Sequence, residues 1–321
     1  MNQSMWALRL HERGGPEQLA YEQAPCPYVG IGDALIRVHA ASFTPTELTW
    51  PSTWVDHAGH DRRPTIPAHE VSGVVEALGY GTVGVAIGQA VYGLTDWHRD
   101  GAAAQHVAVE ARNLAPKPTT LSHVEAAAVP LAGLTAWQAL FDHGGLVAGQ
   151  SALIHGAGGG VGVFAVQLAR AAGAAVIGTG RAWARELVSE LGAATFIDIE
   201  REQFEDVVGQ VDLVFDLVGG ETLGRSWSVL KPDGVLVSVV EDPNESAQAR
   251  HNGARGVFFV VEADRTELVE LARRIDERQL RPIVGDVLPL ATGRDAFQRK
   301  HGRGIPGKTV LQVDDTSDES R

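Results

Sequence analysis

The hydrophobic positions divide the chain into two parts with different periodicities. Up to about residue 118, apolar residues form short alternating or β-branched runs at 34–39, 71–78, 90–93 and 105–109. Proline and glycine separate these runs, as is typical of turns between short strands. This part of the chain therefore predicts a small β-rich barrel or sandwich.

Beyond residue 118, longer segments with helical periodicity alternate with short apolar runs. The first helical segment spans 122–141, and Ser122 followed by Glu125 resembles a capping box at its start. Alternating β and α units of this kind indicate a parallel sheet with helices on both faces. The pattern predicts strands at 152–155, 175–179, 195–197, 212–217 and 234–240 and helices at 161–172, 183–191 and 222–230.

The C-terminal part adds a smaller set of elements. Its pattern predicts helices at 266–279 and 295–300 and a last strand at 309–313. The tail at 314–321 is polar and acidic, and we expect it to be disordered.

Composition narrows the class of protein. The 321 residues suit two domains, and the net charge of −13 disfavours a nucleic-acid or anionic-membrane partner. No signal-like start or membrane-spanning apolar stretch is visible, so we expect a cytoplasmic protein. The single cysteine, Cys26, excludes an internal disulfide and any multi-thiolate metal site.

A glycine-rich segment follows the predicted strand at 152–155 and opens directly into a helical pattern. A dinucleotide turn needs this context, because the backbone must turn tightly and approach a pyrophosphate at a helix N-terminus. We interpret the segment as a cofactor-binding turn formed by Gly158, Gly159, Gly160, Val161 and Gly162. The alternative is a compact strand-to-helix turn in a domain that binds no nucleotide.

The end of the next predicted strand bears on which nucleotide would bind. NAD-binding proteins carry an acidic residue there, but no carboxylate occurs between Val176 and Arg185. Gly180 and Arg181 occupy this place, and a guanidinium is suited to the 2′-phosphate of NADPH. The alternative is that Arg181 and Arg185 are solvated residues of a helix face.

Several ordered blocks resemble the medium-chain dehydrogenase/reductase superfamily, in particular its zinc-independent quinone oxidoreductase-like branch. They are PAHEVSGVV at 67–75, EAAAVPLAGLTAW at 125–137, the glycine turn, DLVGGET at 216–222, LKPDG at 230–234 and GKTV at 307–310. The resemblance implies a GroES-like substrate domain at 1–120 and 281–321. It also implies a Rossmann NADP-binding domain at 121–280, with the active site between the two.

The blocks also show where this chain departs from zinc-dependent relatives. Their three catalytic zinc ligands correspond to Thr44, His69 and a position near Leu131, and only histidine among these is a zinc ligand. We therefore predict no metal site. His57 and His60 lie in a loop without further identifiable partners and are interpreted as solvated loop residues.

Without a Lewis acid, reduction of a conjugated acceptor is more natural than alcohol oxidation. A quinone or an α,β-unsaturated carbonyl spreads the arriving charge, and the protein positions NADPH and excludes water. The candidate substrate-binding residues are Thr44, Trp50, Trp54 and Tyr92, each with ordinary packing as the alternative. No general acid is identified.

The resemblance implies further cofactor contacts and a homodimer. The implied contacts are Thr135, Leu217, Val218, Val239, Phe258, Phe259, Val260, His301 and Arg303. Two other functions stay open: an enoyl-thioester or biosynthetic tailoring reductase, and a non-catalytic NADPH-binding protein. In the enzymatic readings the partner is a small-molecule hydride acceptor.

Overall fold

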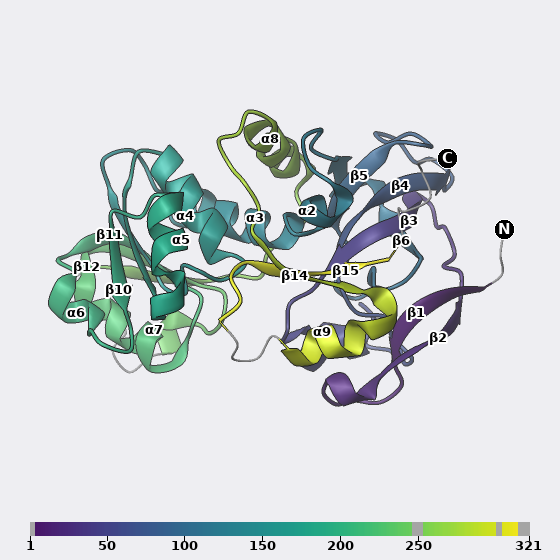
Figure 1. Cartoon of the computed structure of the whole chain (residues 1–321), viewed down its shortest axis with the longest axis horizontal. Coiled ribbons are helices and arrows are strands. Elements are labelled where there is room, and N and C mark those ends of the chain that lie inside the picture. Colours follow the sequence, from purple (N-terminus) through teal and green to yellow (C-terminus); the bar gives the residue numbers. More distant parts are fainter. Residues whose placement is uncertain (1–3, 246–252, 300–303, 314–321) are drawn as a thin grey trace. The chain divides into compact units, whose positions relative to one another are not determined.

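The computed structural model describes residues 4–245, 253–299 and 304–313, and the chain folds as two compact units (Figure 1). Unit 1 comprises Met1–Leu131, Ala263–Arg278 and Pro282–Arg321, and unit 2 comprises Ala132–Glu262 and Gln279–Arg281. The predicted tail at 314–321 lies outside the described residues. Among the described residues, no helix combines the length and apolarity needed to cross a membrane.

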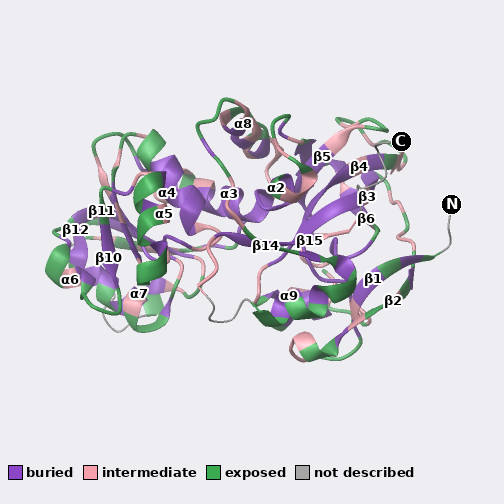
Figure 2. Cartoon of the chain, viewed as in Figure 1, coloured by how far each residue is buried: buried purple, intermediate pink, exposed green. Residues whose placement is uncertain are grey.

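Unit 1 is β-rich, as the first part of the chain predicts. A hairpin of β1 (Ser4–Leu10) and β2 (Leu19–Pro25) accompanies a seven-stranded sheet in the order β14-β15-β3-β4-β5-β7, with β6 paired to β3. The sheet consists of β3 (Asp33–Ser42), β4 (Glu70–Leu78), β5 (Ala90–Leu94), β6 (His106–Glu110), β7 (Leu114–Pro116), β14 (Val284–Pro289) and β15 (Lys308–Gln312). Figure 2 shows β3 buried along almost its whole length.

Four helices belong to unit 1. They are α1 (Pro51–Trp54), α2 (His123–Ala127), α8 (Arg265–Asp276) and α9 (Gly293–Arg299). Helix α9 closes one end of the core, where Phe297 stacks on Phe43 with ring centroids 3.8 Å apart. The last strand, β15, runs antiparallel to β3, so residues from the two ends of the chain share one sheet.

A buried charged cluster joins β15 to the start of β4 and to the residue that follows β3. The Lys308 ammonium forms an ion pair with Glu70 and donates to the carbonyl of Phe43 at 2.9 Å. Glu47 is fully enclosed as well and accepts hydrogen bonds from the backbone N–H groups of Thr44, at 3.0 Å, and of Ala68. Burial raises the pKa of Glu47 to about 7, against these hydrogen bonds and the Lys308 charge.

Unit 2 contains a six-stranded, wholly parallel sheet in the order β10-β9-β8-β11-β12-β13. This is the doubly wound order of a Rossmann domain, so the predicted α/β fold class is confirmed. Its strands are β8 (Ser151–Ile154), β9 (Ala175–Gly180), β10 (Thr195–Asp198), β11 (Val211–Asp216), β12 (Leu230–Ser238) and β13 (Arg255–Phe258). Its helices are α4 (Gly162–Ala171), α5 (Arg185–Leu191), α6 (Phe204–Val207) and α7 (Gly220–Ser226).

The predicted helix at 122–141 is divided. Its capping box is confirmed, since Ser122 and Glu125 exchange side-chain and backbone hydrogen bonds at the start of α2. Helix α2 then ends at Ala127, because proline at 130 has no N–H to donate to a preceding turn. Residue 130 instead begins α3 (Pro130–Trp137), which continues into a π-helical turn at Gln138–His143.

The contacts of α8 explain why it belongs to unit 1, whereas the sequence-based boundaries placed it with the nucleotide domain. Tyr92 donates its hydroxyl to the carbonyl of Leu268, deep within the unit. At the far end of the helix, Asp276 accepts from the backbone N–H groups of Thr119 and Thr120 at 3.1 and 2.9 Å. These hydrogen bonds join residues more than 150 positions apart. Local sequence patterns cannot predict such contacts.

The raised pKa of Glu47 makes the free energy of unfolding depend on pH. Between pH 4.5 and about 7 the folded carboxyl keeps a proton that the unfolded chain releases, so stability falls as the pH rises, by roughly 3 kcal/mol at most. Glu47→Gln removes this linkage. We expect the urea midpoint of the variant to fall less than that of the wild type between about pH 5 and about pH 7.5.

The exposed Glu186→Gln is the matched control and keeps the wild-type dependence on pH. The readout is the difference between the two pH values rather than the absolute stability, because Gln is a poorer acceptor for two N–H donors. Equal slopes for Glu47→Gln and the wild type contradict a buried, protonated carboxyl.

Candidate functional site

The turn at 156–162 requires glycine for three separate reasons. Gly156 has φ of 69°, in the left-handed region that side chains disfavour. A Cβ on Gly158 would lie 2.5 Å from the Cβ of Ala184, and one on Gly162 would lie 2.3 Å from the carbonyl oxygen of Gly156. The strand, turn and helix therefore pack too closely for any larger residue at these positions.

The same turn presents unpaired backbone donors. The N–H of Gly159 is used internally, donating to the Gly156 carbonyl at 2.9 Å. The turn ends at the N-terminus of α4, where the helix dipole adds a partial positive charge. Within the described part of the chain, four amides here have no acceptor: those of Gly158, Gly160, Val161 and Gly162. Such an array is suited to bind the oxygens of a phosphate or pyrophosphate.

Arg181 directly follows Gly180, the last residue of β9. Its side chain is 53% exposed, and its Nε lies 3.6 Å from the carboxylate of Glu200, which is 63% exposed. Arg185, by contrast, places its guanidinium over the Phe196 ring and donates to the Phe196 carbonyl at 3.1 Å. The only contact described for the Arg181 guanidinium is therefore a surface ion pair, and such pairs add little to stability.

The sequence interpretation missed Trp183, which lies in the same region. Its indole is 43% exposed and lies 3.3 Å from where a Cβ on Gly158 would stand. The available signal was an aromatic residue three positions after the end of β9. The ring offers a flat apolar surface beside the glycine turn, suited to stack on a purine.

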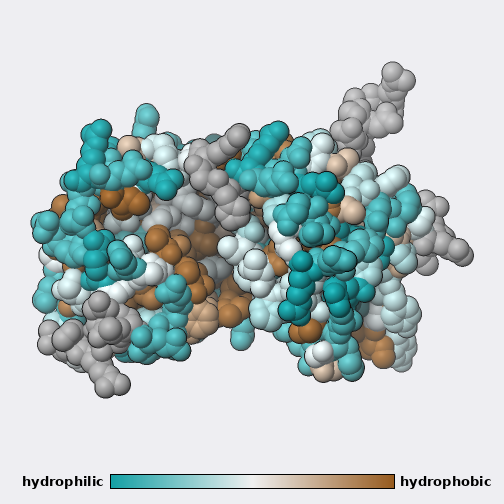
Figure 3. Space-filling view, turned by 90° about the horizontal axis from the view of Figure 1, so that it is seen from below, coloured by the Kyte–Doolittle hydropathy of each residue, from teal (hydrophilic) through white to brown (hydrophobic). Residues whose placement is uncertain are grey.

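Apolar residues gather where β11, β12 and β13 end. The exposed ones are Val218, Val240, Phe258 and Val260, and we call this group the apolar edge. Hydrophobic surface is visible on unit 2 in the left part of Figure 3. The buried Asp216 organises the edge by accepting from the N–H of Gly219 at 3.0 Å and the hydroxyl of Ser238 at 3.0 Å. Burial raises its pKa despite these bonds.

The remaining predicted cofactor residues that the structure describes are half-buried or buried. Leu217 and Val239 directly follow β11 and β12 and are half-buried. Phe259 is buried against the ring of His143, with centroids 4.4 Å apart, and Thr135 is buried on α3. His301 and Arg303 lie outside the described residues.

In unit 1, an aromatic cluster contains one of the predicted substrate residues. Trp50 is half-buried and meets the edge of Trp97, with ring centroids 5.3 Å apart. Trp97 in turn lies 5.0 Å from the ring of His69. Thr44 is also half-buried, but its N–H is bound to Glu47. Sequence reasoning missed Trp97, because it lies far from the 43–63 loop in the sequence.

Two of the predicted substrate residues are buried, which favours the alternative of ordinary packing for both. Tyr92 is 0% exposed, and its hydroxyl is bound to the Leu268 carbonyl. Trp54 is 3% exposed and donates its Nε1 to the Leu48 carbonyl at 3.1 Å. Both side chains pack into unit 1 because their polar atoms find acceptors there, so neither presents a face to a substrate.

The residues at the catalytic zinc positions of zinc-dependent relatives do not fit that metal. Burial lowers the pKa of His69 to about 3, with the Arg62 charge adding to the effect, and its Nδ1 is 2.7 Å from the Thr95 hydroxyl. The side chains of Thr44 and Leu131 are not zinc ligands. These positions therefore offer one suitable ligand where a catalytic zinc site needs three.

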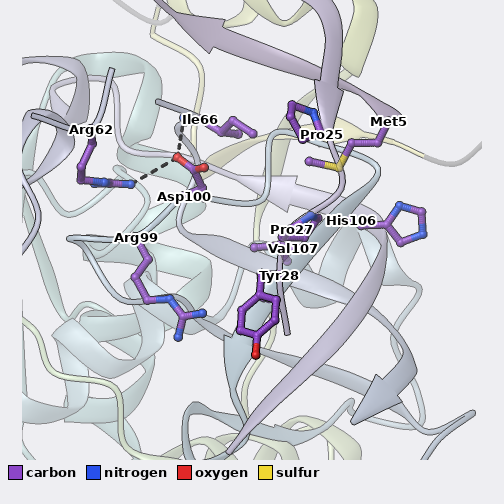
Figure 4. A pocket seen from close by; sticks show the side chains of 12 residues that line it. Met5, Pro25, Pro27, Tyr28, Arg62, Ile66, Arg99, Asp100, His106 and Val107 are labelled. Carbon is purple, nitrogen blue, oxygen red and sulfur yellow. Dashed lines mark hydrogen bonds and ion pairs between the residues drawn. The ribbon is translucent and has the colours of Figure 1, made fainter. Parts of the chain in front are cut away.

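A pocket of about 350 Å³ opens on unit 1, and none of the predicted substrate residues lines it (Figure 4). Its two guanidinium groups are already paired: Arg99 holds Asp33 at 2.9 and 2.7 Å, and Arg62 holds Asp100 at 3.3 Å. The pocket therefore offers no free charge to a ligand.

Two family models match separate parts of the chain. Residues 30–119 match the alcohol dehydrogenase GroES-like domain, and residues 191–311 match the zinc-binding dehydrogenase model.

Two of the relatives are 32% identical to this chain over the aligned residues. One is a "Probable zinc-binding oxidoreductase, mitochondrial" of Arthroderma benhamiae, aligned over 90% of this chain and 91% of its own length. The other is the "2-methylene-furan-3-one reductase" of Solanum lycopersicum, aligned over 89% of this chain and 73% of its own length.

Solved structures share the whole architecture. The quinone oxidoreductase of Coxiella burnetii is 30% identical with a TM-score of 0.88, covering 97% of this chain and all of its own. A mycobacterial protein solved in complex with NADPH is 26% identical with a TM-score of 0.82, covering 96% of this chain and 100% of its own. The chain belongs to the medium-chain dehydrogenase/reductase superfamily of oxidoreductases. Within it, the chain falls in the quinone oxidoreductase-like branch.

The contacts of Gly162 predict that the turn tolerates no side chain there. Gly162→Ala forces a Cβ against the Gly156 carbonyl, and we expect roughly 1–3 kcal/mol of lost stability, measured by thermal or urea unfolding. Gly209→Ala is the matched control in the same unit, because a Cβ there meets no atom within 4 Å, and we expect almost no change. Equal stability of the two variants contradicts the close packing described for the turn.

Proposed function

We propose that this protein is a zinc-independent, NADPH-dependent oxidoreductase that transfers a hydride to a quinone or an α,β-unsaturated carbonyl compound. The observation that carries the proposal is the set of four unpaired amides at the start of α4, with the exposed Arg181 at the end of the neighbouring strand β9. NADPH supplies the hydride when it is bound. The protein contributes binding, orientation and exclusion of water.

The proposed preference for NADPH over NADH rests on Arg181, which follows β9, and on its weak pairing with Glu200. A 2′-phosphate brought to Arg181 replaces Glu200, a weak surface partner, with a doubly charged acceptor that a guanidinium binds more strongly. Trp183 is placed to stack on the adenine beside Gly158. The solved mycobacterial relative that binds NADPH supports the same choice.

The type of acceptor is supported by the relatives and by the surfaces of both units. The relatives include a quinone oxidoreductase and a 2-methylene-furan-3-one reductase, whose substrate is an enone by name. The apolar edge offers an apolar surface to a nicotinamide ring, and Trp50 offers an aromatic face to a flat acceptor. In this scheme the acceptor oxygen receives its proton from solvent, because no described side chain is assigned as the acid.

Independence from zinc rests on the residues at the catalytic positions. Thr44 and Leu131 stand where metal ligands are needed, although one relative is named a probable zinc-binding oxidoreductase. A cytoplasmic location and a homodimer remain part of the proposal; the location rests on the sequence, and the homodimer rests on the family resemblance.

Arg181→Ala tests the choice of cofactor. We expect it to weaken NADPH binding about 10-fold or more, since a charge-assisted pair with phosphate is lost, and to leave NADH binding unchanged. Fluorescence titration with each nucleotide measures both affinities. Arg281→Ala is the matched control, because Arg281 and Glu190 form an ion pair with the same exposures, 53% and 63%, in unit 2. Equal affinity of the wild type for NADH and NADPH contradicts the assignment.

A panel of acceptors tests the reaction. We expect chelator-treated protein to oxidise NADPH, followed by absorbance, with simple quinones or enones and not with saturated aldehydes. Turnover that requires added zinc in the wild type and equally in His57→Ala would overturn the zinc-independent mechanism. Tight NADPH binding without oxidation by any acceptor would favour the non-catalytic binding protein, and preference for thioester-linked enoyl substrates would favour the enoyl-thioester reductase.

A further inference from the structure

Two segments of unit 1 that are far apart in the sequence bring together two histidines and an aspartate. His57 lies in the loop after α1, and Asp96 and His98 lie in the turn after β5. The Nε2 of His57 is 2.7 Å from Asp96 Oδ2, and the Nδ1 of His98 is 3.7 Å from Asp96 Oδ1. The two imidazole rings lie face against face at a tilt, with centroids 4.2 Å apart.

The arrangement has the dimensions of a small metal site. One ligand atom from each residue lies within 4.8 Å of the other two. Ligands about 2.1 Å from a tetrahedral zinc ion are about 3.4 Å apart, so small side-chain rotations bring these atoms into place. His57 is 67% exposed and free to make such a rotation, whereas Asp96 is 18% exposed and held by the backbone N–H of His98 at 2.8 Å.

The surrounding charge favours a cation. The carboxylates of Asp56, Asp96 and Asp100 lie around the guanidinium of Arg62. The guanidinium of Arg99 also interacts with Asp96, but it is paired with a fourth carboxylate, that of Asp33, at 2.7 Å. The Arg62 guanidinium pairs with Asp100 at 3.3 Å and donates to the Trp97 carbonyl at 3.3 Å, so it does not neutralise Asp96 directly. A divalent ion at the cluster therefore meets an excess of negative charge nearby.

We propose that His57, Asp96 and His98 form a binding site for a divalent transition-metal ion, with Zn²⁺ as the probe. Two imidazoles and one carboxylate with an open fourth position are a ligand set that zinc and its first-row neighbours accept. The site is distinct from the catalytic zinc position of zinc-dependent relatives, which here holds Thr44, His69 and Leu131. It also corrects the sequence interpretation of His57 as a loop residue without partners. The inference does not depend on the proposed function.

The site has a structural consequence for the aromatic cluster. Trp97 stands between the two ligands Asp96 and His98 and contacts both Trp50 and His69 through its ring. An ion that ties the 96–98 turn to the 56–60 loop fixes the backbone on both sides of this indole. Metal binding therefore changes the order and the fluorescence of Trp97 without a ligand contact to its ring.

The test uses the full chain after treatment with chelator and dialysis. Titration with Zn²⁺ is followed by calorimetry, and bound metal is counted after gel filtration. We expect one equivalent to bind, and we expect His98→Ala to lower the affinity on the order of 100-fold. Co²⁺ as a second probe reports tetrahedral coordination through the intensity of its visible absorption.

His60→Ala is the matched control, because His60 is 78% exposed in the same loop and pairs with Asp56 rather than Asp96. We expect this variant to bind zinc as the wild type does, and His57→Ala to lose binding. Circular dichroism of each variant shows that the fold is kept. The proposal is overturned if the wild type binds no zinc, if His98→Ala and His57→Ala keep wild-type affinity, or if His60→Ala loses as much affinity as they do. A Trp97→Phe variant shows whether the fluorescence change on binding comes from that residue.

Discussion

The pairing of buried charges in unit 1 is the constraint on which most of its architecture depends. One carboxylate, one ammonium and the carboxyl of Glu47, whose pKa is raised to about 7, leave water together, and their desolvation is offset only if every partner stays in place. Lys308 comes from the last strand, Glu70 from the start of β4, and Glu47 from the loop after β3. The cluster thereby holds the chain's final strand against its early ones. It also fixes the 44–54 loop, because Glu47 accepts from the Thr44 N–H at that loop's first residue.

In unit 2 the corresponding constraint is the parallel arrangement of the strands. The carboxyl ends of six parallel strands lie at one edge of the sheet, and the residues that follow five of them form three chemically different surfaces. After β8 comes the glycine turn with its free amides, after β9 the exposed Arg181, and after β11 to β13 the apolar edge. Along the sheet, in the order β9, β8 and β11 to β13, these surfaces are a cation, an array of amide donors and an apolar surface. Membership in an oxidoreductase superfamily agrees with this order.

The loop around residue 57 shows how a weak sequence signal becomes specific in three dimensions. Two loop histidines among 12 in the chain mean little by themselves, because solvated histidines are common. The turn after β5 supplies the carboxylate of Asp96, which pairs with His57, and the imidazole of His98, which packs against the His57 ring. The same turn carries Trp97, so the histidine cluster and the aromatic cluster share one short piece of backbone.

The sequence by itself determined the features that depend on neighbouring residues. The strand–turn–helix at 152–172, the capping box at Ser122 and the order of β and α units were all predictable, because periodicity, caps and glycine turns act over a few positions. Only the tertiary structure decided that Tyr92 and Trp54 are buried, that α8 belongs with unit 1, and that Asp96 and His98 meet His57. Those outcomes depend on contacts between residues tens to hundreds of positions apart, and packing, rather than local pattern, selects such contacts.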